Sequence, residues 1–313
     1  MTSATACGKT ILFGEHAVVY GRPAIAVPVS GVRARAEVLD TSPGSGVQLV
    51  AQDLNEVYSL QGEETSDTAQ ALRATVYHTL ARLNVPVSEA ALRITVSSQI
   101  PIARGMGSGA ALATALVRAL VAHYGGYLTS REVSDLVYQT ETIFHGTPSG
   151  VDNTVVAYEK PVYFIKGVRA DIFWLARPFT LLIADTGVPS RTRDAVQDLR
   201  HRWQADPARH EALFDAIASL VEHGQRAMTT GDLPTLGALM NENQRLLCEL
   251  DISSPPLDHL IAAARTAGAL GCKLTGGGRG GCLVALVDPD RRDAVSEALL
   301  LEGAARVVPT VVQ

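Results

Sequence analysis

A helical pattern that ends at a glycine- and proline-containing turn constrains the fold of this chain more than any other feature. Apolar residues recur at helical spacing over residues 131–144, and the turn at residues 146–150 then ends the pattern. Glu141 lies before this turn and Asp152 follows it, eleven residues later. The sequence therefore predicts two carboxylates on opposite sides of one rigid turn. Such a pair suits a metal ligand and a group that orients or deprotonates a nucleophile.

An isolated pair of this kind also has a structural explanation. A Glu near a helix C-terminus is usually solvated, and an Asp in the first turn of a helix usually satisfies free N–H groups. Two glycine-rich segments favour the functional interpretation. The first, residues 101–110, follows a strand-like run at 92–97 and precedes a small-residue helix at 110–124. A strand, a glycine loop and a helix N-terminus together form an anion site, because unpaired N–H groups point at the ligand.

The second glycine-rich segment is residues 275–282, which lies between short apolar runs at 272–274 and 283–287. Five of the seven residues from 276 to 282 are glycine, and so many glycines cost much chain entropy. A plain hairpin turn needs only one or two. We therefore expect the backbone of this loop to approach a phosphate or a substrate closely.

Together with the N-terminal run Gly8-Lys-Thr-Ile-Leu-Phe-Gly-Glu-His-Ala-Val-Val-Tyr-Gly21, these segments resemble the GHMP kinases. The resemblance is closest to the branch that acts on mevalonate, because Ala-Val-Val-Tyr-Gly follows Gly-Glu-His. Residues 185–192 are similar to the substrate-side loop of that branch. The resemblance implies an α+β, two-lobed GHMP kinase fold. It places a ribosomal protein S5 domain 2-like ATP-binding lobe at residues 1–170 and a ferredoxin-like lobe at 171–313.

The resemblance also implies a reaction, the ATP-dependent phosphorylation of the primary hydroxyl of mevalonate with Mg²⁺. Asp152 is then expected to accept or orient the hydroxyl proton, and Lys9 to stabilise charge and keep Asp152 ionised. Glu141 and Ser108 are expected to hold Mg²⁺, a hard ion that takes oxygen ligands. The ATP phosphates are expected at Pro101, Gly105, Met106, Gly107, Ser108, Gly109 and Ala110. Mevalonate is expected at Glu15, His16, Thr192, Gly277 and Gly278.

Three positions depart from the family pattern. Cys7 replaces a proline, Gly109 replaces the second serine of the phosphate loop, and Arg279 stands where glycine or alanine is common. Two alternatives therefore stay open. Another GHMP kinase that takes a phosphorylated substrate, such as phosphomevalonate kinase, would use extra cations, and Arg191, Arg193 and Arg279 keep this alternative open. A nucleotide-binding sensor without catalysis is favoured by Gly109 and disfavoured by the retained Lys9, Glu141 and Asp152.

Composition excludes several other classes of protein. With 313 residues, of which 47% are hydrophobic, the chain can bury a sizeable core in two lobes. A net charge of −5 without a basic run argues against nucleic acid or an anionic membrane as a partner. No signal-peptide pattern and no apolar run of membrane-spanning length are present. The four cysteines lack paired metal spacing, so we expect reduced thiols and a cytoplasmic location. Homodimer formation stays open.

Overall fold

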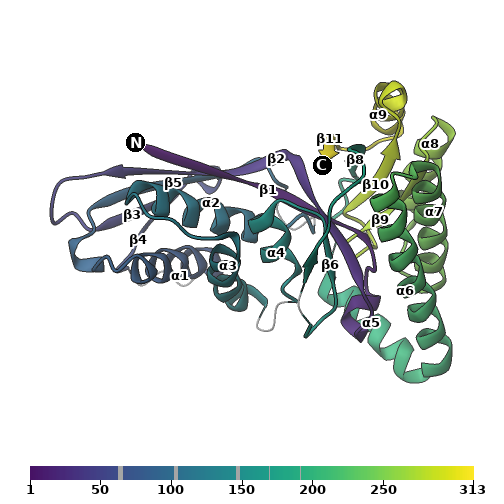
Figure 1. Ribbon diagram of the computed structural model, residues 1–313, viewed down its shortest axis with the longest axis horizontal. Helices are drawn as coiled ribbons and strands as arrows, with labels where there is room; N and C mark the ends of the chain where they lie inside the picture. The colour runs from purple at the N-terminus through teal and green to yellow at the C-terminus, as the bar shows by residue number, and fades with distance from the viewer. Residues whose placement is uncertain (63–65, 102–104, 146–148, 169, 191) are drawn as a thin grey trace. The chain divides into compact units, whose positions relative to one another are not determined.

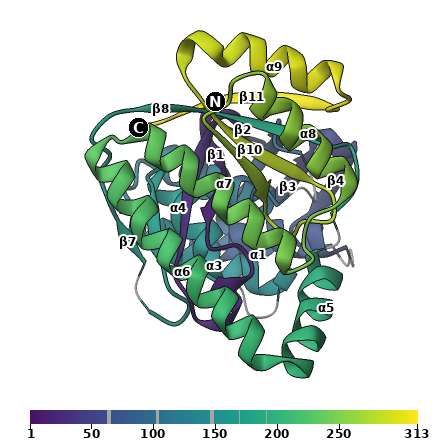
Figure 2. The same cartoon turned by 90° about the vertical axis from the view of Figure 1, so that its right-hand side faces the viewer.

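Helices and strands alternate in mixed order along the chain, as expected for an α+β protein. The computed structural model describes residues 1–62, 66–101, 105–145, 149–168, 170–190 and 192–313, without the side chains at 144, 145, 192 and 193. Figure 1 labels the elements, and Figure 2 gives a second view of them. In the part of the chain so described, no helix is long and apolar enough to cross a membrane.

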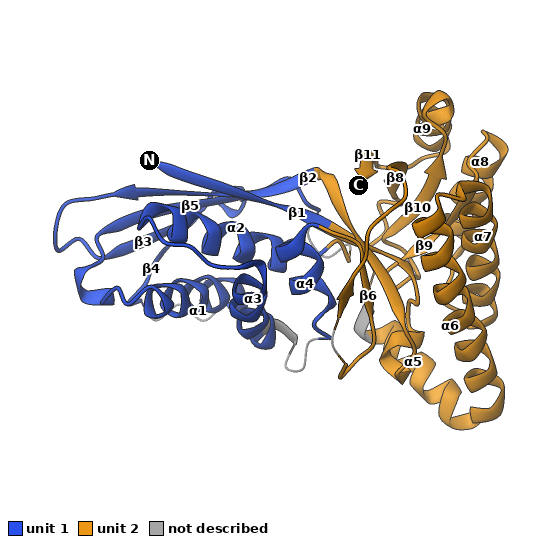
Figure 3. Ribbon diagram, viewed as in Figure 1, with its two compact units in different colours: residues 1–8, 32–101, 107–159 blue, residues 9–31, 102–106, 160–313 orange. Residues whose placement is uncertain are grey.

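The chain forms two compact units, each made of three separate stretches of sequence (Figure 3). Unit 1 contains residues 1–8, 32–101 and 107–159, and unit 2 contains residues 9–31, 102–106 and 160–313. Strands β1 (Thr2–Phe13) and β2 (Ala24–Asp40) each begin in one unit and end in the other. The division into folding domains at residues 170 and 171 stays a prediction.

The strands of unit 1 pair around β5 (Leu92–Ser98). One edge of β5 pairs antiparallel with the second half of β2, and its other edge pairs in parallel with β3 (Val47–Ala51). Strand β3 in turn pairs antiparallel with β4 (Glu56–Ser59). Every second residue from Leu92 to Val96 is buried, so one face of β5 is turned towards the core.

Four helices complete unit 1, and they pack mainly against one another. The most buried is α2, whose alanine-rich sequence lets it contact the other three helices and β5. Helix α1 begins where the hydroxyl of Ser66 accepts a hydrogen bond from Ala69 N at 3.2 Å. The bounds are α1 Asp67–Arg82, α2 Ser108–His123, α3 Ser130–His145 and α4 Val151–Tyr158.

Unit 2 contains a four-stranded antiparallel sheet with the strand order β11-β8-β10-β9. Every residue of β10 is buried, which places this strand at the centre of the core. The outer edge of β9 is covered by α7 (Leu233–Glu249): Cys272 N donates to the Asn241 side chain at 3.0 Å, and Leu274 N donates to the Gln244 side chain at 2.9 Å. The bounds are β8 Phe179–Asp185, β9 Gly271–Thr275, β10 Cys282–Val287 and β11 Arg306–Val312.

Helices α5 to α9 belong to the same unit, with α7 and α8 packed against strands of the sheet (Figure 2). The side chains of Asp206 and Asp232 cap the N-termini of helices α6 and α7. Each accepts a hydrogen bond from the backbone N–H three positions later in the chain, and a proline occupies the first turn of each helix. Phe214, Leu247 and Leu283 are among the buried side chains of the core. The remaining bounds are α5 Thr192–Ala205, α6 Pro207–Thr230, α8 Pro255–Thr266 and α9 Arg292–Leu301.

The differences from the sequence-based expectation lie in short elements. Strands β3, β4 and β7 (Asp171–Ile172) were not predicted, because runs of two to five residues carry too little periodicity to separate them from loops. Strand β2 is also longer than a typical strand, because its second half pairs with β5 and its first half pairs with β6 (Val162–Phe164). The other predicted helices and strands are present, with ends shifted by a few residues.

Candidate active site

The first glycine segment leads into the N-terminus of α2 in unit 1. Gly107 precedes the helix at φ 69°, a left-handed conformation that glycine adopts without strain, and as the N-cap residue it has no side chain with which to cap the helix. Ser108, Gly109 and Ala110 form the first turn. The first N–H groups of a helix have no partner within the helix, so an uncapped N-terminus is a site for phosphate oxygens. Pro101 is half-buried, and the expected loop residues 102–104 lie outside the described residues.

The two predicted carboxylates lie on two helices of unit 1 that pack together. Glu141 is near the C-terminal end of α3 and is only 4% exposed, whereas Asp152 is the second residue of α4 and is partly exposed. Gly150 starts α4 at φ 88°. The turn residues 146–148, on which the sequence argument relied, lie outside the described residues.

Buried hydrogen bonds fix both acid-bearing helices. The Asn153 side chain donates to the Ser134 hydroxyl at 2.9 Å and to the Ser134 carbonyl at 3.2 Å, which joins α4 to α3. The hydroxyls of Thr140 and Thr75 lie 2.8 Å apart, which joins α3 to α1 next to Glu141. Sequence analysis assigned no role to these four residues, because a Thr, Ser or Asn within a helix carries no sign of its distant partner.

The residues expected to hold Mg²⁺ suit an ion that is bound partly by the protein and partly by the phosphates of a nucleotide. Glu141 offers a carboxylate, and Ser108 offers a half-buried hydroxyl. Among the described residues, no group of three or more His, Cys, Asp or Glu side chains is placed to hold a metal by itself. Protein Mg²⁺ sites usually combine one or two carboxylates with phosphate oxygens and waters. The Glu141 carboxylate and the Ser108 hydroxyl have the oxygen chemistry that such a site uses.

In unit 2, the first glycine segment and the last one come close to each other. The Lys9 backbone N–H donates to the carbonyl oxygen of Met106 at 3.0 Å, which ties β1 to the segment before α2. A Cβ atom added to Gly105 would lie 3.7 Å from the Cα atom of Gly276. Lys9 itself is 5% exposed. The fold therefore brings Lys9 and both glycine segments, which are distant in sequence, to one part of this unit.

His16 joins the N-terminal motif to the second glycine loop. Its Nε2 atom lies 3.0 Å from the carbonyl oxygen of Gly277. The pKa of His16 is lowered to about 4, mainly by burial and to a smaller extent by the charges of Arg279 and Arg202, against the effect of the Gly277 hydrogen bond, which raises it. The ring is therefore neutral at pH 7. Because a carbonyl oxygen can only accept, Nε2 carries the hydrogen, and Nδ1 is the acceptor atom of the ring.

Glu15 is fully buried beside His16, with its carboxylate paired to the ammonium of Lys273. The predicted contact of Glu15 with substrate stays a prediction. Gly14 precedes this pair at φ 93°, where an added Cβ would lie 2.5 Å from the Ala24 Cα atom. Only glycine fits this close approach, which explains the Gly-Glu-His order of the motif.

The second glycine loop lies along the segment at residues 185–190, which sequence analysis assigned to the substrate side. The Thr186 hydroxyl donates to the Gly281 carbonyl at 2.8 Å, and the Ser190 hydroxyl donates to the Gly278 carbonyl at 2.8 Å. Gly278 is at φ 72°, and a Cβ atom there would lie 2.3 Å from the Ile252 carbonyl oxygen. The side chain of Thr192, which was predicted to contact the substrate, lies outside the described residues.

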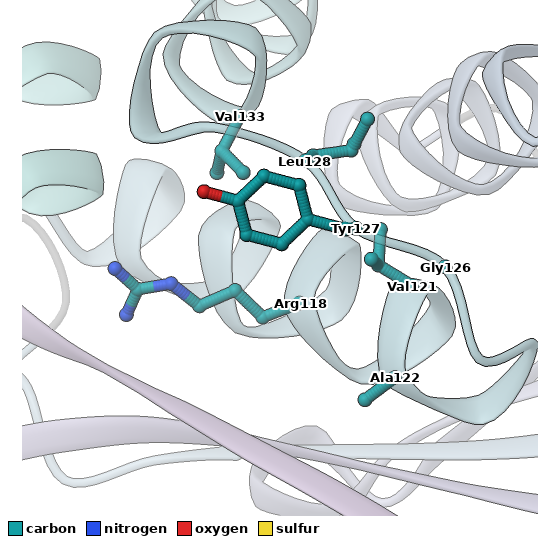
Figure 4. Close-up of a pocket in the computed structure, with 7 residues that line it drawn as sticks. All are labelled: Arg118, Val121, Ala122, Gly126, Tyr127, Leu128 and Val133. Atoms are coloured by element: carbon teal, nitrogen blue, oxygen red, sulfur yellow. The ribbon is translucent and has the colours of Figure 1, made fainter.

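A separate cavity of about 140 Å³ lies in unit 1 at the C-terminal end of α2 (Figure 4). None of the predicted site residues lines it. Its lining residues are Arg118, Val121, Ala122, Gly126, Tyr127, Leu128 and Val133.

Comparison with known proteins decides the family. Residues 69–160 match the family model "GHMP kinases N terminal domain", and residues 215–305 match "GHMP kinases C terminal". The mevalonate kinase of Pyrococcus horikoshii is 32% identical over 98% of this chain and 95% of its own length. The chain belongs to the GHMP kinases. A second relative of this GHMP kinase, the mevalonate kinase of Aeropyrum pernix, is 34% identical over 90% of the chain and 87% of its own length.

Solved structures agree with this assignment. The structure of this GHMP kinase matches that of L. major mevalonate kinase in complex with R-mevalonate with a TM-score of 0.82 and 31% identity, over 100% of this chain and 96% of the other. The Methanococcus jannaschii mevalonate kinase gives a TM-score of 0.86 at 25% identity, over 99% of this chain and 98% of the other. The Streptococcus pneumoniae phosphomevalonate kinase, at 16% identity and a TM-score of 0.81, shows the common fold alone. The predicted GHMP kinase fold is confirmed.

Proposed function

We propose that this protein is an enzyme that transfers the γ-phosphoryl group of ATP to the primary hydroxyl of mevalonate. The product is 5-phosphomevalonate, an intermediate in the synthesis of isoprenoid precursors by the mevalonate pathway. The observation that carries the proposal is the similarity to mevalonate kinases over nearly the whole chain, at 32% identity. Lys9, Glu141 and Asp152, the residues expected to perform the chemistry, are all retained in this sequence.

The nucleotide side of the site is the N-terminus of α2. The uncapped first turn offers N–H groups to the ATP phosphates, and Gly105 and Gly107, both at positive φ, allow the backbone to approach them closely. Glu141 and Ser108 would hold Mg²⁺ with the phosphates. When bound, this ion neutralises charge on the phosphates. The full set that we assign to ATP is Pro101, Gly105, Met106, Gly107, Ser108, Gly109 and Ala110.

Phosphoryl transfer depends on positioning and charge neutralisation rather than on covalent catalysis by the protein. Asp152 accepts or orients the proton of the attacking hydroxyl. Lys9 supplies a positive charge for the phosphoryl group in transfer, and its backbone hydrogen bond to Met106 fixes the strand that carries it. The hydrogen bonds of Asn153 and Thr140 hold the helices of Asp152 and Glu141 rigid, which favours a preorganised site.

The substrate side combines the N-terminal motif with the second glycine loop. His16, Thr192, Gly277 and Gly278 are assigned to mevalonate, and Glu15, also expected there from the family resemblance, lies next to His16 in the sequence. The acceptor atom of His16, Nδ1, suits a hydroxyl hydrogen of mevalonate, because hydroxyl groups donate one hydrogen bond. The tight packing at Gly278 keeps side chains out of this loop and leaves its backbone for the substrate.

A phosphorylated substrate is the main alternative within the family, and it would need a cation on the substrate side. Arg279 is the described residue that sequence analysis singled out for that role. Its guanidinium forms ion pairs with Asp198 and, at 3.6 Å, with Asp251. Because two carboxylates already balance this charge, the contacts favour mevalonate over its phosphate. Arg191 and the side chain of Arg193 lie outside the described residues.

Release of ADP, measured with a coupled assay across several acceptors, tests the proposal. We expect turnover with mevalonate and much weaker turnover with phosphomevalonate, galactose and homoserine. A preference for phosphomevalonate would favour the family alternative. ATP binding without turnover on any acceptor would favour the sensor. The cytoplasmic location and homodimer formation stay predictions.

A further inference from the structure

Glu15 is held inside unit 2 by two side chains to which sequence analysis gave no role. Its Oε1 atom pairs with the Lys273 ammonium, and its Oε2 atom accepts a hydrogen bond from the Asn243 side chain at 3.2 Å. Glu15, Lys273 and Asn243 are each 0% exposed. Lys273 also donates to the Leu274 carbonyl oxygen at 2.7 Å. Both carboxylate oxygens of Glu15 are therefore engaged within the protein.

A buried ion pair of this kind is a poor way to gain stability. Removing two charges from water costs several kcal/mol per ion, and the attraction between them often does no more than offset that cost. Apolar side chains of similar size would often serve stability as well. The best-attested use of buried polar groups is to fix one register among several. We therefore look for the role of Glu15, Lys273 and Asn243 in the segments that they hold in register.

The two segments joined by the ion pair are joined again at the predicted substrate histidine. His16 follows Glu15, Gly277 lies four residues after Lys273, and His16 Nε2 is 3.0 Å from the Gly277 oxygen. His16 has φ 60°, a conformation that costs a non-glycine residue on the order of 1–3 kcal/mol and persists only when its surroundings impose it. Glu15 is the residue directly before this strained histidine, and its ion pair with Lys273 holds the backbone on that side in place.

We propose that Lys273 and Asn243 are positioning residues for substrate recognition, which hold the His16 ring through Glu15. They fix the Nε2–H group of His16 on the Gly277 carbonyl oxygen and so leave Nδ1 as the acceptor for mevalonate. Glu15 then acts from inside the protein and does not itself touch the substrate. This inference rests on the proposed function and deepens its substrate side.

The electrostatics agree with this arrangement. Burial lowers the pKa of Lys273, and the adjacent Glu15 carboxylate opposes that effect. The positive charge on Lys273 is therefore stabilised by Glu15. Burial also lowers the pKa of His16, which keeps the ring neutral and its two nitrogens distinct. A neutral ring accepts a hydrogen bond from a hydroxyl only through the nitrogen that carries no hydrogen, so the tautomer and the ring orientation decide where this acceptor lies. Holding that orientation is the task assigned to the three buried residues.

The first test compares two asparagines on the same helix. The Asn243 side chain donates a hydrogen bond to Glu15, whereas the Asn241 side chain forms hydrogen bonds with the backbone of Leu270 and Cys272. We expect Asn243→Ala to raise the KM for mevalonate about tenfold, the effect of losing one hydrogen bond to a charged group. The KM for ATP should change less than about twofold, a smaller change than the loss of one hydrogen bond to ATP would cause. Asn241→Ala should alter thermal stability but leave both KM values unchanged. Equal changes in both KM values, or none, in folded Asn243→Ala protein would overturn the proposal.

The neutral double variant Glu15→Gln/Lys273→Met provides a second test if Asn243→Ala does not fold. It removes both buried charges at similar volume, so it should fold, yet it should show the same selective rise in the KM for mevalonate. An unchanged KM for mevalonate in this variant would refute the positioning role.

Nitrogen NMR of the His16 ring gives a readout that does not depend on turnover. The His16 signals are assigned by their loss in His16→Gln. Wild-type protein should show a single neutral Nε2–H tautomer at pH 7, and the double variant should show a mixture. If wild-type enzyme does not phosphorylate mevalonate, the proposed function is wrong, and the tautomer alone decides whether the network orients His16. An identical tautomer in both proteins would overturn the inference.

Discussion

The Nε2 atom of His16 lies 3.0 Å from the carbonyl oxygen of Gly277, a contact between residues 261 positions apart in the chain. It places the histidine of the N-terminal motif against the backbone of the last glycine loop. Both segments were assigned to the substrate side from sequence. The contact explains how an N-terminal and a C-terminal motif can form one recognition surface.

Removing the His16 ring should weaken substrate binding selectively. In His16→Ala, we expect the KM for mevalonate to rise about ten- to a hundredfold, because a buried hydroxyl left without its acceptor costs roughly 1–3 kcal/mol. The KM for ATP should change little. His210→Ala is a suitable control, because His210 is also buried in unit 2 and its ring forms a hydrogen bond with the carbonyl oxygen of Asp206 on its own helix. A rise in the KM for ATP alone would assign His16 to the nucleotide side.

His16 should also make the fold sensitive to acid. Its pKa is about 4 in the folded protein against 6.5 for an unperturbed histidine, so between these values the unfolded chain binds a proton that the folded chain does not. The free energy of unfolding should therefore fall as the pH decreases from 7, by on the order of 2 kcal/mol at pH 5. Urea unfolding of wild type and His16→Gln across this range measures the effect. Parallel pH profiles of the two proteins would contradict it.

The second glycine loop should tolerate a side chain at Gly276 far better than at Gly278. Both residues have positive φ, so alanine costs roughly 1–2 kcal/mol at either position. An added Cβ meets nothing closer than 3.8 Å at Gly276 but would lie 2.3 Å from the Ile252 carbonyl oxygen at Gly278. We expect Gly278→Ala to lose a further ~1–3 kcal/mol, measured by denaturant unfolding. Equal losses for the two variants would show that the loop relaxes freely.

Asp152 should be needed for the chemical step and not for nucleotide binding. Asp152→Asn keeps the shape of the side chain but removes the base, so kcat should fall by about two to four orders of magnitude. The affinity for ATP, measured by calorimetry, should change little. Asp135→Asn, an exposed position on α3, serves as the control with normal turnover. Near-normal kcat in Asp152→Asn would remove this residue from the mechanism.

Sequence periodicity predicted most of the longer helices and strands, because amphipathic helices and buried strands leave a local pattern, whereas the two-lobed fold was expected from the family resemblance. Strand β5, Leu92–Ser98, matches the strand-like run predicted at residues 92–97, and the glycines at 276–281 indicated a loop with unusual backbone conformations. The site at His16 was expected from the family resemblance of the Gly-Glu-His motif and stays a prediction. These features are readable because each is encoded within a few neighbouring residues.

The partners of these residues could not be predicted in the same way. Lys273 is one lysine in a short apolar run, and nothing local indicates that it pairs with Glu15, 258 residues away. Asn243 has the pattern of an ordinary polar position on a helix, although it is fully buried. Buried polar networks depend on tertiary packing between distant segments, so only the structure reveals them.

The most direct test of the central claim is to identify the product of the reaction. Wild-type protein, mevalonate, ATP and Mg²⁺ are incubated, and the phosphorylated product is examined by phosphorus–proton correlation NMR while ADP is measured in parallel. We expect one ADP for each phosphate ester formed, with the phosphate on the primary hydroxyl of mevalonate. ADP release without a phosphate ester, or phosphate on another oxygen, would contradict the assignment.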